Sequence, residues 1–128
     1  MKDYLRWHKK KSIVESKETR VYFHEREVWY AHVGLNIGHE QDGSGIKYGR
    51  PVLIFRKFSN SVFVGIPLTT KIGTGKFYMR IKFNDMENFL ILTQIRLYDA
   101  KRLYSKIGML SADTVNEVKI RVIRLIID

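Results

Sequence analysis

Two strand-like runs joined by a short polar turn constrain the fold of this chain more than any other part of its sequence. The runs Pro51–Phe55 and Val62–Ile66 are rich in β-branched and aromatic residues, which favour strands. Phe58–Ser61 lies between them and has the composition of a turn. A proline is tolerated at the first position of a strand, where its missing N–H costs little. The pattern predicts an antiparallel hairpin.

Other runs predict further strands on both sides of this hairpin. Glu27–Val33 is aromatic and β-branched, and Phe89–Leu92 is a continuous apolar run of the kind found in buried central strands. Asn84–Glu87 is expected to turn the chain before Phe89–Leu92, and Gln94–Tyr98 is expected to continue the sheet. In Phe77–Phe83, apolar side chains alternate with side chains that carry a polar group, as along a strand with one buried face. The alternation assigns Tyr78, Arg80 and Lys82 to a solvent or RNA face, and Phe77, Met79, Ile81 and Phe83 to the core.

The first of these strands has no plainly polar face. Val28, Tyr30 and His32 share one side of it, and Trp29, Ala31 and Val33 share the other. We therefore expect both faces to be covered. On this interpretation His32 is a hydrogen-bonded structural histidine, not a catalyst.

The chain ends in a predicted helix that runs to Ile127. Ser111 is a good N-cap, and Asp113 in the first turn complements the helix dipole. Its apolar arc is wider than one surface covers, so we expect the sheet to cover part of it, and the N-terminal arm or a second subunit to cover the rest. The arc comprises Val115, Val118, Val122, Leu125 and Ile126, with Ile120, Ile123 and Ile127 beside them.

Short strands followed by a terminal helix predict a mainly β (α+β) fold, a small curled antiparallel barrel with a C-terminal helix. We expect this domain over residues 26–128, preceded by an N-terminal helix or loosely held arm over residues 1–25. A chain of 128 residues is long enough to bury a core.

Composition limits the partners and the compartment. The net charge of +10 favours a polyanion: RNA, DNA, an anionic membrane or an acidic protein tail. The absence of cysteine suits a reducing cytosol. No run approaches the roughly 20 apolar residues of a membrane span, and the first residues lack the apolar core of a signal peptide. We therefore expect a cytoplasmic protein with no membrane contact.

Nothing in the sequence predicts a metal or another cofactor. His24 and Glu27 have a ligand-like spacing but lack a third ligand nearby, and no thiolate is available. Gly34–Gly49 contains five glycines and is long enough to be a functional loop. It is not a phosphate-binding P-loop, because Ser44 stands where that motif needs lysine.

An ordered set of short motifs resembles the MazF/PemK family of toxin endoribonucleases, from about Glu27 to about Ile127. The motifs are Glu40-Gln41, Arg50-Pro51, Pro67-Leu68-Thr69-Thr70 and Gln94-Ile95-Arg96-Leu97, with Lys101-Arg102-Leu103 and Lys106-Ile107-Gly108 further on. The resemblance implies an SH3-like barrel with a C-terminal helix, usually as a homodimer. It also implies metal-free cleavage of single-stranded RNA, in which the ribose 2′-hydroxyl attacks the adjacent phosphate.

The resemblance also implies roles for individual residues. Arg50 is expected to stabilise the charge of the transition state, and Thr69 to donate a hydrogen bond to the phosphate or align the nucleophile. Thr70 is the less suitable threonine, since its side chain would face away if the strand continued. Glu40 is the expected acid or base. His39 is an alternative for either step near neutral pH, although neighbours in an extended segment face opposite ways.

Two departures from the family pattern affect this assignment. Asp42–Tyr48 lengthens the spacing between Glu40-Gln41 and Arg50. Some members carry an aspartate next to the glutamine that corresponds to Gln94. Thr93 occupies that position here, so this variant of the mechanism does not carry over.

The expected RNA contacts are His39, Lys71, Lys76 and Gln94. An acidic antitoxin segment is expected to compete for the same positive surface near Arg50 and Lys71, and DNA to be bound at most through the antitoxin. A non-catalytic module that binds RNA or protein on the same fold is the alternative, because a gyrase-inhibiting toxin shares this fold. Tyr48, Phe77 and Tyr78 lie near lysines and would suit such binding.

Overall fold

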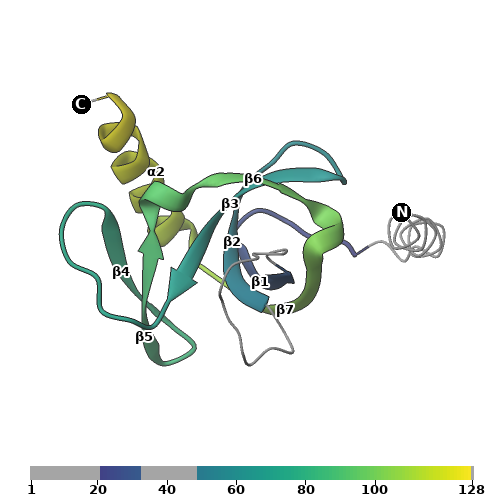
Figure 1. Cartoon of the computed structure of the whole chain (residues 1–128), viewed down its shortest axis with the longest axis horizontal. Coiled ribbons are helices and arrows are strands. Elements are labelled where there is room, and N and C mark those ends of the chain that lie inside the picture. The colour runs from purple at the N-terminus through teal and green to yellow at the C-terminus, as the bar shows by residue number, and fades with distance from the viewer. Residues whose placement is uncertain (1–20, 33–48, 128) are drawn as a thin grey trace, which may run out of the picture.

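The computed structural model describes residues 21–32 and 49–127 of the chain (Figure 1). Most of the predicted N-terminal arm, and the glycine-rich loop that carries His39 and Glu40, lie outside the described residues. Within the described part, Phe23 is fully buried, and its backbone carbonyl accepts a hydrogen bond from the Lys57 ammonium at 2.7 Å. The division between arm and domain at residue 25 stays a prediction.

Seven antiparallel strands form one sheet with the order β4-β5-β3-β2-β1-β7, and β6 pairs with β3 beside this path. The end strands β4 and β7 do not pair with each other in the described part of the chain, so the sheet is open. The mainly β class with a C-terminal helix is confirmed, and closure into a barrel stays a prediction. The strands are β1 Glu27–His32, β2 Gly49–Lys57, β3 Val62–Thr69, β4 Tyr78–Phe83, β5 Met86–Ile91, β6 Arg96–Asp99 and β7 Leu103–Met109.

The predicted hairpin of β2 and β3 is confirmed, with Val52 opposite Pro67 and an irregularity between Ile54 and Arg56. The turn between β4 and β5 is tighter than expected. Only Asn84 and Asp85 form it, both with positive φ (52° and 63°), as in the two-residue turns that match the twist of a hairpin. Gln94 lies in the 3₁₀ helix η1, Leu92–Gln94, and not in a strand.

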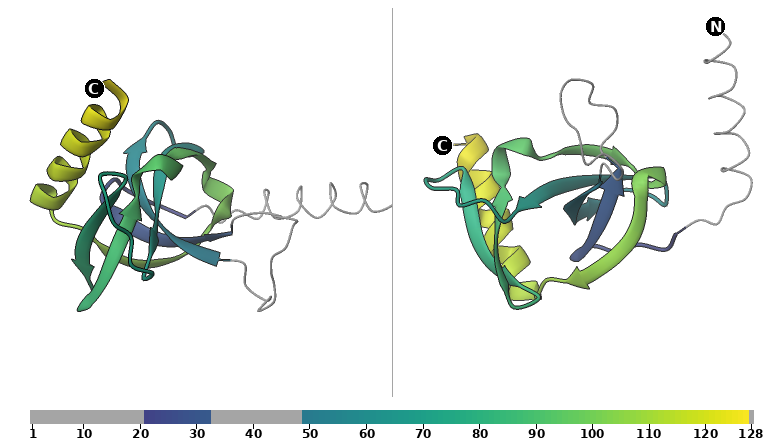
Figure 2. Two further views of the ribbon diagram at one scale, coloured as in Figure 1. Left: turned by 60° about the vertical axis from the view of Figure 1, so that its left-hand side comes forward. Right: turned by 60° about the horizontal axis from the view of Figure 1, so that its bottom comes forward.

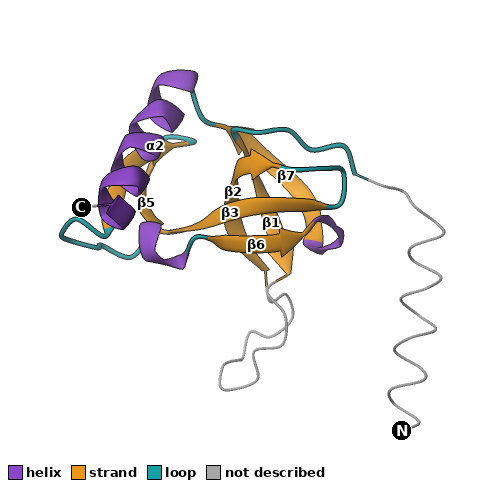
Figure 3. Ribbon diagram, turned by 90° about the horizontal axis from the view of Figure 1, so that it is seen from above, coloured by secondary structure: helices purple, strands orange, loops and turns teal. Residues whose placement is uncertain are grey.

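The terminal helix α2 spans Ala112–Ile127. Ser111 caps it as predicted, because the Thr114 N–H donates to the Ser111 Oγ at 3.1 Å. Figures 1 and 2 show the helix beside β4 and β5, and Figure 3 shows it beside β5. Within the described residues, no helix is long and apolar enough to cross a membrane.

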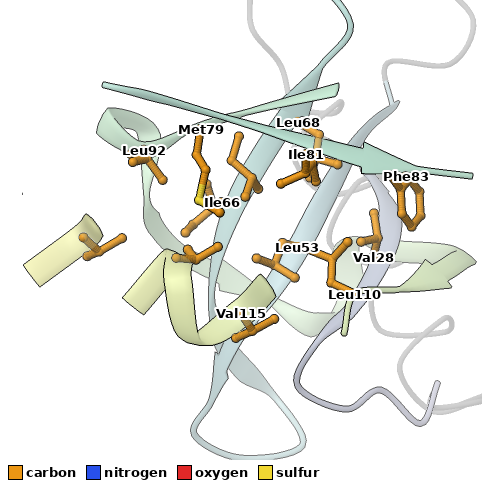
Figure 4. Close-up of a cluster of buried hydrophobic side chains, with 13 residues drawn as sticks. Val28, Leu53, Ile66, Leu68, Met79, Ile81, Phe83, Leu92, Leu110 and Val115 are labelled. Atoms are coloured by element: carbon orange, nitrogen blue, oxygen red, sulfur yellow. The ribbon is translucent and has the colours of Figure 1, made fainter. Parts of the chain in front are cut away.

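Two clusters of buried side chains hold the sheet together. The helix-side cluster lies between the sheet and α2 (Figure 4). The second, which we call the β6-side cluster, packs around β1, β2, β3 and β6. The helix-side cluster comprises Val28, Leu53, Ile66, Leu68, Met79, Ile81, Phe83, Leu90, Leu92, Leu110, Val115, Val118 and Val122. The β6-side cluster comprises Phe23, Trp29, Ala31, Val52, Ile54, Phe63, Tyr98, Ala100 and Leu103.

Two burial predictions are wrong in part. Phe77 is exposed, because β4 begins one residue later and the alternation does not extend to it. Tyr30 and His32 are exposed, so one face of β1 is uncovered at that end. Ile120, Ile123, Ile126 and Ile127 are exposed on the described chain, so cover of this part of the helix by the N-terminal arm or a second subunit stays a prediction. The sheet therefore covers only the side of the helix that carries Val115, Val118 and Val122.

Candidate functional site

A cavity of about 550 Å³ opens where the start of β2 meets the end of β3. Antiparallel pairing of Val52 with Pro67 brings Arg50 and Thr69 to the same end of the hairpin. Gln94 reaches the cavity from η1. The lining residues are Arg50, Pro51, Leu68, Thr69, Thr70, Lys71, Ile72, Tyr78, Asn88, Ile91 and Gln94.

A second cavity of about 480 Å³ adjoins the first, since Arg50 and Gln94 line both. It lies beside η1 and β6. Its lining residues are Arg50, Pro67, Thr93, Gln94, Ile95, Arg96 and Tyr98.

The charged side chains among the described lining residues are all cationic: Arg50 lines both cavities, Lys71 the first and Arg96 the second. No aspartate, glutamate or histidine is among the described lining residues. The Arg50 guanidinium is exposed, and no described carboxylate forms an ion pair with it. Such a site favours an anion, and a guanidinium grips two oxygens of a phosphate at once.

The Thr69 hydroxyl is oriented by its own chain. The Lys71 backbone N–H donates to the Thr69 Oγ1 at 3.1 Å. A hydroxyl has one proton to donate, and with its oxygen accepting from Lys71 that proton is available to a ligand in the cavity. Thr70 lines the same cavity, because β3 ends at Thr69 and the chain turns there.

The structure adds residues that sequence reasoning missed. Asn88 is buried in β5 yet lines the first cavity, and its place directly before the apolar run Phe89–Leu92 was the only signal for it. Arg96 lines the second cavity with its guanidinium 4.6 Å from the centre of the Tyr98 ring. Tyr98 in turn stacks on Phe63 at 5.3 Å. Arg96 therefore rests on a rigid part of the β6-side cluster.

Among the described residues, Lys76 is the predicted site residue that the structure does not bring to the cavities. Lys76 is not among the lining residues, and its ammonium lies 5.8 Å from the centre of the Phe77 ring. His39 and Glu40 lie outside the described residues. The structure thus assembles the cationic and hydrogen-bonding parts of the predicted site, while the acid and base stay predictions.

Glu27, half of the ligand-like pair in the sequence, is a buried structural group. Its Oε1 accepts hydrogen bonds from the Trp29 indole N–H at 2.8 Å and the His24 backbone N–H at 2.9 Å. Its Oε2 lies 3.2 Å from both the His24 ring nitrogen and the Lys106 ammonium. Among the described residues, no three histidine or acidic side chains gather as a metal site would require.

The sequence profile of the PemK-like, MazF-like toxins of type II toxin–antitoxin systems matches residues 24–126. No curated protein matches the sequence.

Solved structures share the fold at low sequence identity. MazF from Deinococcus radiodurans superposes with a TM-score of 0.62 at 18% identity, over 82% of this chain and 97% of that one. The Mycobacterium tuberculosis toxin MazF-mt6 gives 0.59 at 16% identity, over 77% and 94%. A mycobacterial endoribonuclease in complex with its cognate antitoxin gives 0.58 at 17% identity, over 78% and 90%.

Proposed function

The chain belongs to the PemK-like, MazF-like toxin family of type II toxin–antitoxin systems, and from this we propose that it is a toxin that cleaves single-stranded RNA in the cytoplasm. The observation that carries the proposal is the convergence of Arg50, Thr69, Lys71 and Gln94 on one cationic cavity. Arg50 and Thr69 are predicted catalytic residues, and Lys71 and Gln94 are predicted RNA contacts. The four residues come from three separate segments of the chain.

The proposed reaction is a transesterification. The ribose 2′-oxygen attacks the adjacent phosphorus, the bond to the 5′-oxygen of the next nucleotide breaks, and a 2′,3′-cyclic phosphate forms. The 2′-oxygen loses a proton and the leaving 5′-oxygen gains one. Glu40, with His39 as the alternative, is assigned to this proton transfer.

Arg50 and Thr69 stabilise the negative charge that develops on the phosphate. The Arg50 guanidinium is permanently charged, and a preorganised donor acts most strongly where negative charge grows in the transition state. Thr69 donates its remaining hydroxyl proton to a phosphate oxygen. Lys71 and Gln94 bind the RNA next to this phosphate.

The test is a cleavage assay on a single-stranded RNA. We expect a cyclic phosphate and a 5′-hydroxyl as products, no cleavage of DNA, and full activity in EDTA, because the nucleophile comes from the RNA and not from a metal-bound water. A matched RNA with deoxyribose only at the nucleotide 5′ to the cut should bind and stay intact. Cleavage of that RNA, or loss of activity in EDTA, contradicts the mechanism. Binding without any cleavage would instead support a non-catalytic module.

The proposed regulator is an acidic antitoxin segment that lies across Arg50 and Lys71. The surplus of positive charge and the cationic cavities support this, and a similar mycobacterial endoribonuclease was solved with its cognate antitoxin. DNA contact is proposed only through the antitoxin. The antitoxin and RNA should compete, and both affinities should fall with added salt. An antitoxin that leaves RNA affinity unchanged contradicts the shared surface.

We propose a homodimer from the uncovered face of α2. Ile120, Ile123, Ile126 and Ile127 are 47–73% exposed along it, and a row of isoleucines of this size favours a protein contact. Light scattering should give twice the chain mass at micromolar concentration. A monomer there would contradict the dimer.

A further inference from the structure

A row of stacked aromatic side chains lies on the sheet beside the first cavity. The Tyr30 and Tyr104 rings stack with centroids 6.1 Å apart and planes 17° apart. The His32 ring also stacks on Tyr104, with centroids 4.2 Å apart and planes 25° apart. Tyr30 is 40% exposed and Tyr104 38%, so the row presents ring surface to solvent. We call these three residues the aromatic row.

Local backbone features hold Tyr104 in this row. In β7, Ser105 lies opposite Tyr30 and Leu103 opposite Ala31, so the register skips Tyr104. Such an irregularity re-aims a side chain. The Tyr104 ring crosses β1 and its hydroxyl reaches Gly49 in β2, where a Cβ would overlap it. Burial and the Tyr30 phenol both raise the pKa of Tyr104, which keeps it neutral.

The aromatic row is continuous with the cavity. Tyr30 lies directly opposite Pro51 in the pairing of β1 with β2, so their side chains share one face of the sheet. Pro51 lines the first cavity together with Arg50 and Thr69. The aromatic row therefore adjoins the first cavity at Pro51.

We propose that the aromatic row is a stacking site for a base that flanks the scissile phosphate. The inference rests on the proposed function and extends it to the neighbouring nucleotide. Unstacked bases of single-stranded RNA bind by stacking on exposed aromatic side chains next to cationic grooves. The charge around the row agrees, since the Arg102 guanidinium donates to the His32 carbonyl at 3.2 Å.

Binding affinity tests the assignment directly. The probe is an RNA of about ten nucleotides that carries the mapped cleavage site, with a single deoxyribose 5′ to the cut. Tyr30→Leu and Tyr104→Leu should each weaken its binding about 5- to 100-fold, the range that one lost stacking contact gives. Tyr104→Phe keeps the ring and should bind as the parent does. Tyr22→Leu is the matched control, because Tyr22 is 81% exposed and lines neither cavity.

A scan of abasic nucleotides supplies the second measurement. The parent should lose affinity when one particular base next to the cut is removed, and Tyr30→Leu should show no further loss at that position, since the partner is already gone. A Tyr30→Leu scan identical to the parent's overturns the stacking site while leaving RNA cleavage in place. Leucine variants that change the molar mass in light scattering but keep the abasic profile also overturn it, and mark a contact between copies. A parent that cleaves no RNA overturns the proposed function and this inference together.

Discussion

Charged side chains are treated in opposite ways at two places in this molecule. At Glu27 the fold buries a carboxylate and satisfies both oxygens with the Trp29 indole, His24 and the Lys106 ammonium. At the cavities it gathers Arg50, Lys71 and Arg96 without a single acidic lining residue in the described part of the chain.

The difference separates structural charge from binding charge. A buried charge must find its partners inside the protein, because an unsatisfied one costs several kcal/mol. An exposed cation is solvated, so it needs no partner for stability and stays available to a phosphate. Substitutions at Glu27 should therefore change folding, and substitutions at Arg50 should change catalysis.

The largest expected effect is that of Arg50→Ala on cleavage. Loss of a preorganised charge-stabilising donor should lower the cleavage rate roughly 10²–10³-fold, with the unfolding midpoint unchanged. Arg50→Lys should also be poor, because it lacks the two-pronged grip. Arg80→Ala is the control. Arg80 is exposed, forms an ion pair with Glu87 at 3.1 Å, and does not line either cavity. A folded Arg50→Ala protein with the parent rate would refute the role of Arg50.

Thr69→Val should cost less, about 10- to 100-fold in rate, as expected for one hydrogen bond to a charged group. Valine keeps the shape but neither accepts from the Lys71 N–H nor donates to the phosphate. Thr69→Ser keeps both contacts and should retain most of the activity. Equal rates for the valine variant and the parent would make Thr69 a structural residue only.

Glu27→Gln should affect stability and not chemistry. The amide cannot accept from all the donors around it, and each buried donor left unsatisfied costs about 1–3 kcal/mol. Urea unfolding measures this loss in the free energy of unfolding, while the rate per folded molecule should equal that of the parent. Glu87→Gln is the control, because its exposed pair with Arg80 should contribute about 0–1 kcal/mol.

The smallest effect concerns acid pH. Burial alone would raise the pKa of Glu27, but the hydrogen bonds from Trp29, His24 and Lys106 hold it below the ordinary glutamate value. The unfolded chain therefore binds the proton more tightly. The stabilisation is fully present above the ordinary pKa and is lost as the pH falls through the lowered one. The free energy of unfolding should fall more on acidification in the parent than in Glu27→Gln. Parallel curves would contradict the lowered pKa.

Much of the fold was predictable because its signals are local. The β2–β3 hairpin, the alternation of Met79, Ile81 and Phe83, and the Ser111 cap depend on residues close together in the chain. Propensity, periodicity and capping chemistry act over a few residues. The predictions were less accurate at the ends of elements, as at Phe77, because the pattern there has no further residue to limit it.

The amino-acid sequence alone predicted strands β1 to β6 but not β7, together with the terminal helix and the basic character of the chain, and its motifs placed Arg50, Thr69, Lys71 and Gln94 among the site candidates. The folded structure determines which side chains share a cavity, because strand pairing joins positions far apart in the chain. It brought Asn88 and Arg96 to the site, left Lys76 outside the lining, and exposed Tyr30 beside Pro51. Exposure of a side chain depends on which distant element packs over it, and no local pattern contains that information.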